Sequence, residues 1–199
     1  MKRLLIGLLF CTLAMACSAQ PAEPKTSLAK PKPVETGRLG EIFSGYQDRM
    51  ADQIDNDFEE GDFPRIINLL KVQADIDRQG YETWTDLIWM LGNVELYDEQ
   101  ILTARQFREF NPTSSDAWYP EAEIYFIKRS SLKVIPIMEE ALKLPGKHHP
   151  NSYRILALSW NRLGFKSEAI RIWETMLKDY PNDERARVQL ERLKKAVSV

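Results

Sequence analysis

The sequence contains few of the residues from which most catalytic and metal sites are built. Its 199 residues include two cysteines and two histidines. The histidines, His148 and His149, are neighbours, so they would point in different directions on a helix, and no cysteine or further histidine stands at a metal-ligand spacing from them. A glycine-rich phosphate loop and a nucleophile-elbow serine are also lacking. We therefore expect a protein without a metal or cofactor that is not an enzyme.

Concentrated positive charge and strand-like patterns are lacking as well. The sequence has 27 lysines and arginines against 29 aspartates and glutamates, a formal net charge of -2. Nucleic-acid phosphates are bound by strongly basic surfaces, so we expect no nucleic-acid partner. Alternating runs of valine, isoleucine and threonine, which are typical of β-strands, do not occur. The sequence therefore favours an all-helical protein.

The N-terminus has the pattern of a secretory signal. Lys2 and Arg3 precede an apolar run over residues 4–16, which is too short to cross a bilayer as a permanent helix. The run ends in Ala-Met-Ala immediately before Cys17. Because Cys11 lies inside the run, removal of the signal would leave Cys17 alone, and an intrachain disulfide would be impossible.

This ending resembles the lipobox of bacterial lipoproteins, in which a peptidase cuts before a cysteine that carries a diacylglycerol. The resemblance implies a signal peptide over residues 1–16, a lipid on Cys17, and export to a bacterial membrane, expected to be the periplasmic side of the outer membrane. The family usually has leucine at the position of Ala14. Ordinary cleavage after Ala16 or Ala19 is the alternative, and it would give a soluble periplasmic or secreted protein.

A proline-rich tether is predicted over residues 17–38. Four prolines stand there among alanine, lysine, serine and glutamate, with almost no large apolar side chains. This composition is typical of an extended chain. At the polyproline rise of about 3.1 Å per residue, the tether could hold the following domain up to roughly 60 Å from the membrane.

From residue 47 onward, aromatic, small, glycine and proline positions recur with a period of about 34 residues. The clearest copy spans residues 150–183, where two amphipathic helices are predicted on either side of Gly164 and the second ends before Pro181. Their apolar faces recur at steps of three and four: Tyr153, Leu156, Ala157 and Trp160 in the first, and Ala169, Ile172, Trp173 and Met176 in the second. The small side chains of Ala157 and Ala169 would let the two backbones approach closely.

Weaker copies span residues 47–80, 81–114 and 115–148. The third has Arg129 where the turn glycine belongs and Pro136 inside its second helix, which we expect to be bent or to start late. The second has larger residues, Ile88 and Gln100, where small ones are expected, and the first helix of the first copy is rich in aspartate. A leading helix is expected just before that copy. A charged capping helix is expected over residues 183–196, with these residues inward: Ala186, Val188, Leu190 and Leu193.

These spacings resemble the tetratricopeptide repeat. The resemblance implies an all-α fold over residues 39–199, an α-solenoid of stacked helix–turn–helix repeats with a C-terminal capping helix. A single hairpin cannot bury its own apolar face, which is why such repeats stack. In this family the first helices of the pairs line a concave groove that binds a peptide or a partner protein.

The positions that the resemblance places in the groove change character along the chain. The predicted partner-binding residues are Trp89, Asn93, Tyr119, Glu123, Phe126, Arg154, Asn161 and Arg162. The resemblance also places Asp48, Asp55, Phe58 and Glu59 of the first copy on this side. Such a groove would be acidic at its N-terminal end, aromatic in the middle and basic at its C-terminal end, which suits an extended peptide with apolar anchors and charged ends. The alternative is that Trp89, Tyr119 and Phe126 pack on adjoining helices as ordinary core residues.

Three functions remain open after this reading, because a fold does not fix a function. The first is a non-enzymatic interaction scaffold of the bacterial cell envelope, anchored by its lipid. Short lipoproteins of this repeat class also suggest an assembly factor for outer-membrane β-barrel proteins or a pilus secretin. The third is a carbohydrate-binding or catalytic role that relies on scattered carboxylates.

Overall fold

A computed structural model describes residues 37–197 of the chain, which form nine α-helices and no β-strand. The helices are α1 (Arg38–Glu60), α2 (Phe63–Ile76), α3 (Tyr81–Asn93), α4 (Tyr97–Phe110), α5 (Ser115–Ile127), α6 (Ser131–Ala141), α7 (Pro150–Arg162), α8 (Lys166–Asp179) and α9 (Glu184–Val197). The predicted signal peptide, Cys17 and the tether up to residue 36 lie outside the described residues. Within those residues, no helix has both the length and the apolar character that crossing a membrane requires.

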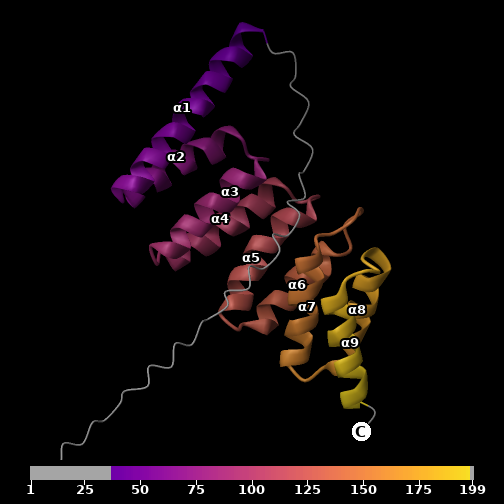
Figure 1. Ribbon diagram of the computed structural model, residues 1–199. Coiled ribbons are helices and arrows are strands. Elements are labelled where there is room, and N and C mark those ends of the chain that lie inside the picture. Colours follow the sequence, from indigo (N-terminus) through magenta and orange to yellow (C-terminus); the bar gives the residue numbers. More distant parts are fainter. Residues whose placement is uncertain (1–36, 198–199) are drawn as a thin grey trace, which may run out of the picture.

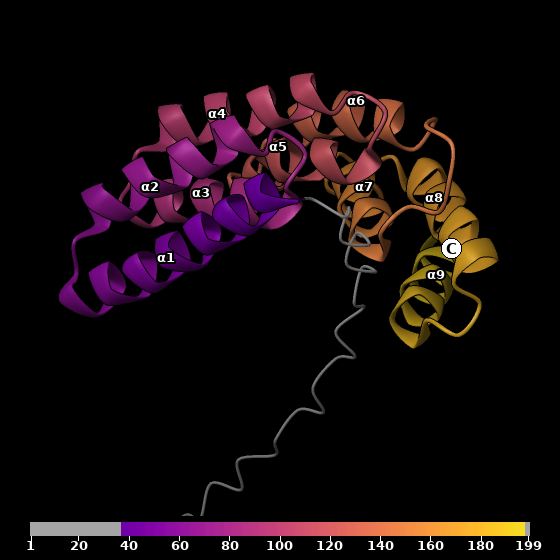
Figure 2. The same cartoon turned by 90° about the horizontal axis from the view of Figure 1, so that it is seen from above.

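The helices form consecutive helix–turn–helix pairs that stack into an arch (Figure 1). Each helix contacts the next one along the chain, and α3 also contacts α5 while α5 contacts α7. Figure 2 shows α4 and α6 along the outer side of the arch, whereas α1 and α9 lie at the two ends of its hollow side. The predicted all-α solenoid is confirmed.

The repeat is visible in the backbone of the turn inside each pair. One residue in each of these four turns has a positive φ: Gly61 (77°), Glu95 (64°), Arg129 (57°) and Gly164 (86°). These residues are 34, 34 and 35 positions apart, which matches the period of the sequence. Glycine adopts this backbone conformation freely, whereas a residue with a Cβ is strained by about 1 to 2 kcal/mol in it. Arg129 therefore occupies the turn position that the sequence assigned to it, at an energetic cost.

The two small residues predicted to lie between the helices of the last pair are both in the core. Ala157 of α7 and Ala169 of α8 are fully buried in an apolar cluster that extends from α5 to α9. A second cluster extends from α2 to α5, and in it the rings of Trp84 and Phe107 stack with their centroids 5.3 Å apart. Both clusters include residues of α5, so this helix takes part in the cores of the N-terminal and the C-terminal halves.

The N-terminal helix differs from the expectation. The leading helix and the first helix of the first repeat are one continuous helix, α1, with 23 residues. The side chains of Ile42, Phe43 and Tyr46 near its start are exposed. α1 packs mainly against α2, so part of its apolar stripe has no neighbour within the described chain.

The other two deviations have local causes. α6, which contains Pro136, does not start late: it begins at Ser131, two residues after Arg129, just as α8 begins two residues after Gly164. It ends early instead, and at 11 residues it is the shortest of the described helices. Val188 of α9 was expected to face inward but is 52% exposed. The capping helix has only α8 as a principal neighbour, so the stripe that contains Ala186 and Leu193 is buried and Val188 lies outside it.

Candidate binding surface

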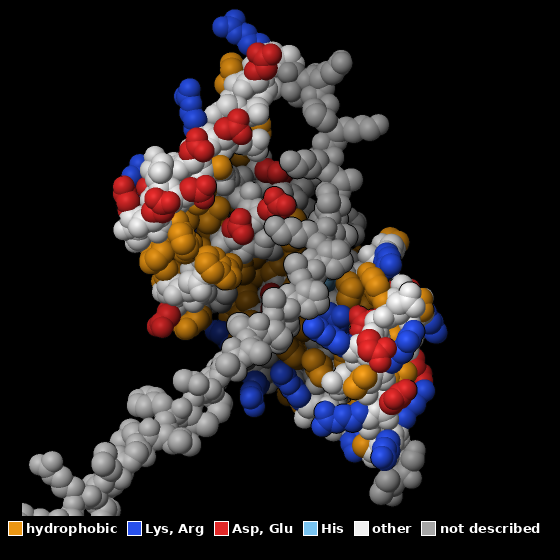
Figure 3. All heavy atoms as spheres, in the orientation of Figure 1, with side chains coloured by type: hydrophobic (Ala, Val, Ile, Leu, Met, Phe, Trp, Pro, Cys, Tyr) orange, Lys and Arg blue, Asp and Glu red, His pale blue; other side chains and the backbone are white. Residues whose placement is uncertain are grey.

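The hollow side of the arch carries opposite charges at its two ends. Figure 3 looks onto this side and shows carboxylates gathered over the N-terminal helices and lysine and arginine side chains over the C-terminal helices. α1 has seven acidic and two basic residues, whereas α9 has five basic and two acidic residues. Such a field orients an approaching charged partner before contact is made.

Helix α3 presents Trp89 and Asn93 at its surface. Its buried side chains, which include Trp84, Leu87 and Leu91, recur at steps of three and four and so occupy the opposite face. Trp89 is 57% exposed and lies at the edge of a hollow of about 330 Å³. Asn93 is exposed at the last position of the helix. Trp89 is thus exposed and lies outside the core clusters of the described chain.

Helix α5 presents a hydrogen-bonded pair, Tyr119 and Glu123, one helical turn apart. The Tyr119 hydroxyl donates to Glu123 Oε1 at 2.6 Å, and its ring makes a T-shaped contact with the His149 ring at a centroid distance of 6.4 Å. Burial, followed by the hydrogen bond to Glu123, raises the pKa of the Tyr119 hydroxyl above its ordinary value. Both side chains are half-buried, so they contribute to packing and to the surface at the same time.

Phe126 and Arg162 come together from α5 and α7. The guanidinium carbon of Arg162 lies 3.9 Å from the centroid of the Phe126 ring, and Arg162 Nη1 donates a 3.0 Å hydrogen bond to the carbonyl oxygen of Phe126. Arg162 is exposed and Phe126 is half-buried. Phe126 also packs against the apolar cluster that extends from α5 to α9, so its ring lies between that cluster and the positive charge of Arg162.

Arg154 holds the capping helix, while Asn161 is exposed. Arg154 Nη2 donates to Asp183 Oδ2 at 2.6 Å and Nη1 donates to Asn151 Oδ1 at 2.8 Å. Asp183 also accepts a 2.8 Å hydrogen bond from the backbone N–H of Ala186 in the first turn of α9. The charge of Arg154 is therefore largely neutralised inside the protein, unlike that of Arg162.

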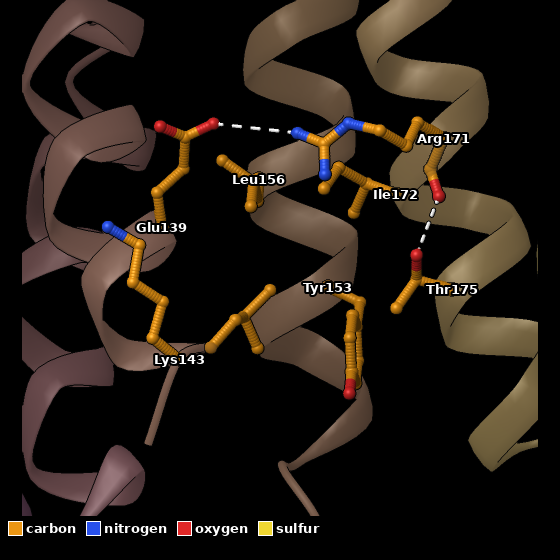
Figure 4. A pocket seen from close by; sticks show the side chains of 8 residues that line it. Glu139, Lys143, Tyr153, Leu156, Arg171, Ile172 and Thr175 are labelled. Atoms are coloured by element: carbon orange, nitrogen blue, oxygen red, sulfur yellow. Dashed lines mark hydrogen bonds and ion pairs between the residues drawn. The ribbon is translucent and has the colours of Figure 1, made fainter.

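A different hollow, of about 310 Å³, lies between α6, α7 and α8 (Figure 4). A 3.7 Å ion pair joins Glu139 to Arg171 across it, and the hydroxyl of Thr175 donates to the Arg171 carbonyl oxygen at 2.9 Å. The Tyr153 hydroxyl donates to Asp179 at 2.5 Å. The polar groups around this hollow satisfy one another, which favours a structural role for them.

The sequence placed Phe58 and Trp89 on the groove side, but it did not predict that the space between α1 and α3 is open. Two adjoining hollows lie there, and their walls include Phe43, Tyr46, Phe58 and Trp89. A signal was available, because Phe43, Tyr46, Met50 and Ile54 repeat at steps of three and four through the acidic part of α1. Helix α2 covers only part of that apolar stripe.

Neither a protein-family model nor a curated protein sequence matches this chain. Among solved structures, a crystal structure of MamA has a TM-score of 0.59 at 21% sequence identity and covers 76% of this chain and 82% of the MamA chain. MamA from residue 41 to the end, from Desulfovibrio magneticus RS-1, has a TM-score of 0.57 at 12% identity and covers 76% of this chain and 85% of its own. YrrB, described as a TPR protein with an unusual peptide-binding site, has a TM-score of 0.51 at 15% identity and covers 62% of this chain and 63% of its own.

The chain has a tetratricopeptide-like fold. The helix pairs, the 34-residue spacing of the turns and the similarity to YrrB agree on this point. At these identities the similarity concerns the fold alone, and function has to be argued from the surface of this chain.

Proposed function

We propose that this chain is a non-enzymatic scaffold that binds a peptide, or a segment of a partner protein, along the hollow side of its arch. The observation that carries the proposal is the exposure of Trp89 in the middle of α3, beside a hollow. Large apolar surface exposed in this way is a feature of interaction sites, and tryptophan, tyrosine and arginine dominate binding hot spots. Trp89 and the Phe126–Arg162 stack would supply two such anchors on neighbouring first helices.

The charges support a directional partner. The acidic end at α1 and the basic end at α9 would select a segment whose own charges run in the opposite order. The fold is compatible with this role, since YrrB, which shares it, is described as having a peptide-binding site.

The proposed location is the bacterial cell envelope, with the chain anchored by a lipid on Cys17. The support for this part is the sequence of residues 1–17, with its basic start, its short apolar run and its cysteine. A partner that proves to be a β-barrel protein or a secretin subunit would identify the scaffold as an assembly factor.

A pull-down from detergent-solubilised native cells tests the binding surface. The test variant combines Trp89→Ala, Tyr119→Ala and Phe126→Ala, and the matched control combines Val72→Ala, Leu102→Ala and Leu132→Ala, three exposed side chains of α2, α4 and α6. We expect an envelope protein that is enriched by the wild type and the control but lost with the test variant, after circular dichroism has shown that all three fold. Equal enrichment by all three chains would contradict the proposal, because binding would then not involve this surface.

A further inference from the structure

The first helix of the stack is set apart from the third. α3 contacts α5 and α5 contacts α7, but α1 makes no comparable contact with α3. The space between them consists of two hollows of about 330 and 270 Å³. Both are lined by Ala51, Gln73 and Thr83, so they adjoin and form one groove, which we call the α1–α3 groove.

The α1–α3 groove has an apolar floor and aromatic walls. Its floor comes from α2, with Ile66 and Leu70 in one hollow and Ile76 in the other. The aromatic side chains of its walls are Phe43, Tyr46, Phe58 and Trp89, which are 43%, 36%, 51% and 57% exposed. In Figure 3, hydrophobic side chains gather beside the end of α1 that lies next to α3, with carboxylates around them. Four exposed aromatic side chains along one groove are a feature of interaction sites.

The charged residues that line the groove all have the same sign. They are Asp48, Asp55, Asp77, Glu82 and Asp86, and no lysine, arginine or histidine is among the lining residues. The side chains of Asp55 and Asp86 form no hydrogen bond or ion pair with any other residue between 37 and 197. Burial, and then the negative charge of Glu82, raise the pKa of Asp86 above its ordinary value. The lining of the groove is therefore negatively charged and has no basic side chain to neutralise it.

We propose that the α1–α3 groove receives a basic amphipathic helix of the partner protein, with its apolar face on the aromatic walls and its lysines or arginines against the carboxylates. This inference rests on the proposed scaffold function, and it names the class of partner segment that binds at the N-terminal end of the arch. The groove has the form of a helix-binding site, since two helices make its walls and a third makes its floor. From Phe43 to Phe58 it extends over about 22 Å at 1.5 Å per residue, which is the length of roughly four helical turns.

Binding of a synthetic peptide tests the inference directly. The protein is the mature chain, residues 17–199, with Cys17→Ser so that no detergent is present, and both core clusters lie entirely within it. The probe is a fluorescein-labelled peptide of about 18 leucines and lysines, with leucine at helical spacing. Two further peptides replace lysine by glutamate or leucine by serine. We expect the leucine–lysine peptide to raise the anisotropy in a saturable way and the other two to bind at least about tenfold more weakly.

Two matched variants separate the groove from the general negative charge of the chain. The test variant is Asp55→Asn with Asp86→Asn, and the control is Asp75→Asn with Glu109→Gln, two exposed carboxylates of α2 and α4 outside the groove. Both variants lose the same formal charge. We expect the test variant to weaken binding of the leucine–lysine peptide about fivefold and the control to leave it unchanged. Equal weakening by both, or equal binding of the glutamate peptide, would overturn the inference.

Other occupants of the groove would give distinct results. If deletion of residues 18–36, which contain Lys25, Lys30 and Lys32, tightens peptide binding, the groove belongs to this chain's own segment and the inference fails. If the protein alone dimerises in sedimentation experiments and Asp55→Asn with Asp86→Asn abolishes the dimer, the occupant is a second copy and the inference also fails.

The inference and the proposed function can fail separately. If the groove variant leaves peptide binding intact while Tyr119→Ala with Phe126→Ala abolishes capture of the native partner, the scaffold function stands and the groove assignment is wrong. If the groove variant weakens the peptide but capture is insensitive to both variants, the groove binds basic helices and the proposed function is wrong.

Discussion

The guanidinium carbon of Arg162 lies over the ring of Phe126, 3.9 Å from its centroid, although 36 residues separate the two in the chain. The same guanidinium donates a hydrogen bond to the Phe126 carbonyl oxygen, so a single side chain ties the end of α5 to the end of α7. We expect Arg162→Ala to lower the free energy of unfolding by about 1 kcal/mol, through loss of the stacking and of the hydrogen bond.

The variant Arg162→Lys distinguishes the contribution of these contacts from that of the positive charge. Lysine keeps the favourable positive charge at the C-terminus of α7 but cannot stack as a planar group, so it should restore less than half of the loss. Urea unfolding measures both changes, with Arg192→Ala on α9 as the exposed control. An effect of Arg192→Ala equal to that of Arg162→Ala would mean that the contact with Phe126 adds nothing to stability.

Substitutions in the two turns of the second half of the stack should change the free energy of unfolding in opposite directions. Arg129 holds a φ of 57° with a Cβ, whereas Gly164 holds 86° without one. Arg129→Gly should therefore raise the free energy of unfolding by about 0.5 to 1 kcal/mol, and Gly164→Arg should lower it by about 1 to 2 kcal/mol. A Cβ at Gly164 would meet no atom within 4 Å, so the expected loss comes from the backbone alone. Thermal unfolding of the two variants beside the wild type measures it, and changes of the same sign would contradict this account.

Asp86 links the stability of the chain to pH. Burial, and then the charge of Glu82, raise the pKa of Asp86 above 3.8, so the folded state favours the neutral acid and loses stability when the pH rises through the folded pKa. Asp86→Asn should therefore raise the free energy of unfolding at pH 7, and this gain should disappear below about pH 3.8, where the acid is protonated in both states. Urea unfolding between pH 3 and pH 7 measures the gain, with Asp75→Asn as the control. A gain that does not change with pH would mean that ionisation of Asp86 is not its source.

The proposed lipid anchor predicts a change of location without a change of fold. Cys17→Ser should move the protein from the membrane fraction to the soluble fraction of cells, because it removes the proposed site of acylation. The circular dichroism spectrum of the helical domain should stay the same. Ser18→Ala serves as the control and should remain with the membranes. A Cys17→Ser chain that still sediments with membranes would point to another anchor.

The periodic part of the fold was predictable because it depends on short steps along the chain. Steps of three and four located the buried faces of α7 and α8, and the 34-residue period located the turn at Arg129 even without glycine. These signals are local, so each repeat carries them whether or not its neighbours are known.

The surface was less predictable because it depends on how far apart neighbouring helices lie. Trp89 and Tyr119 were predicted for the same role, but Tyr119 is half-buried beside His149 while Trp89 faces the gap that α1 leaves. The partner of Arg154 is Asp183, 29 residues away on the capping side, and no spacing rule points to it. Periodicity identifies the face of a helix, whereas the distance to the next helix is a property of the assembled stack.

The position of α1 also bears on how the stack opens. Among its described side chains only Met50 and Asp57 are buried, and its main neighbour is α2. In a repeat array each helix depends on its neighbours for protection, so backbone amides of α1 should exchange with solvent sooner than those of α5, which both cores share. A helix bound in the α1–α3 groove would give α1 a second neighbour and would slow this exchange. Opening of α1 and binding in the groove would then be thermodynamically linked. Hydrogen exchange of the α1 amides would therefore report binding without any label on the partner.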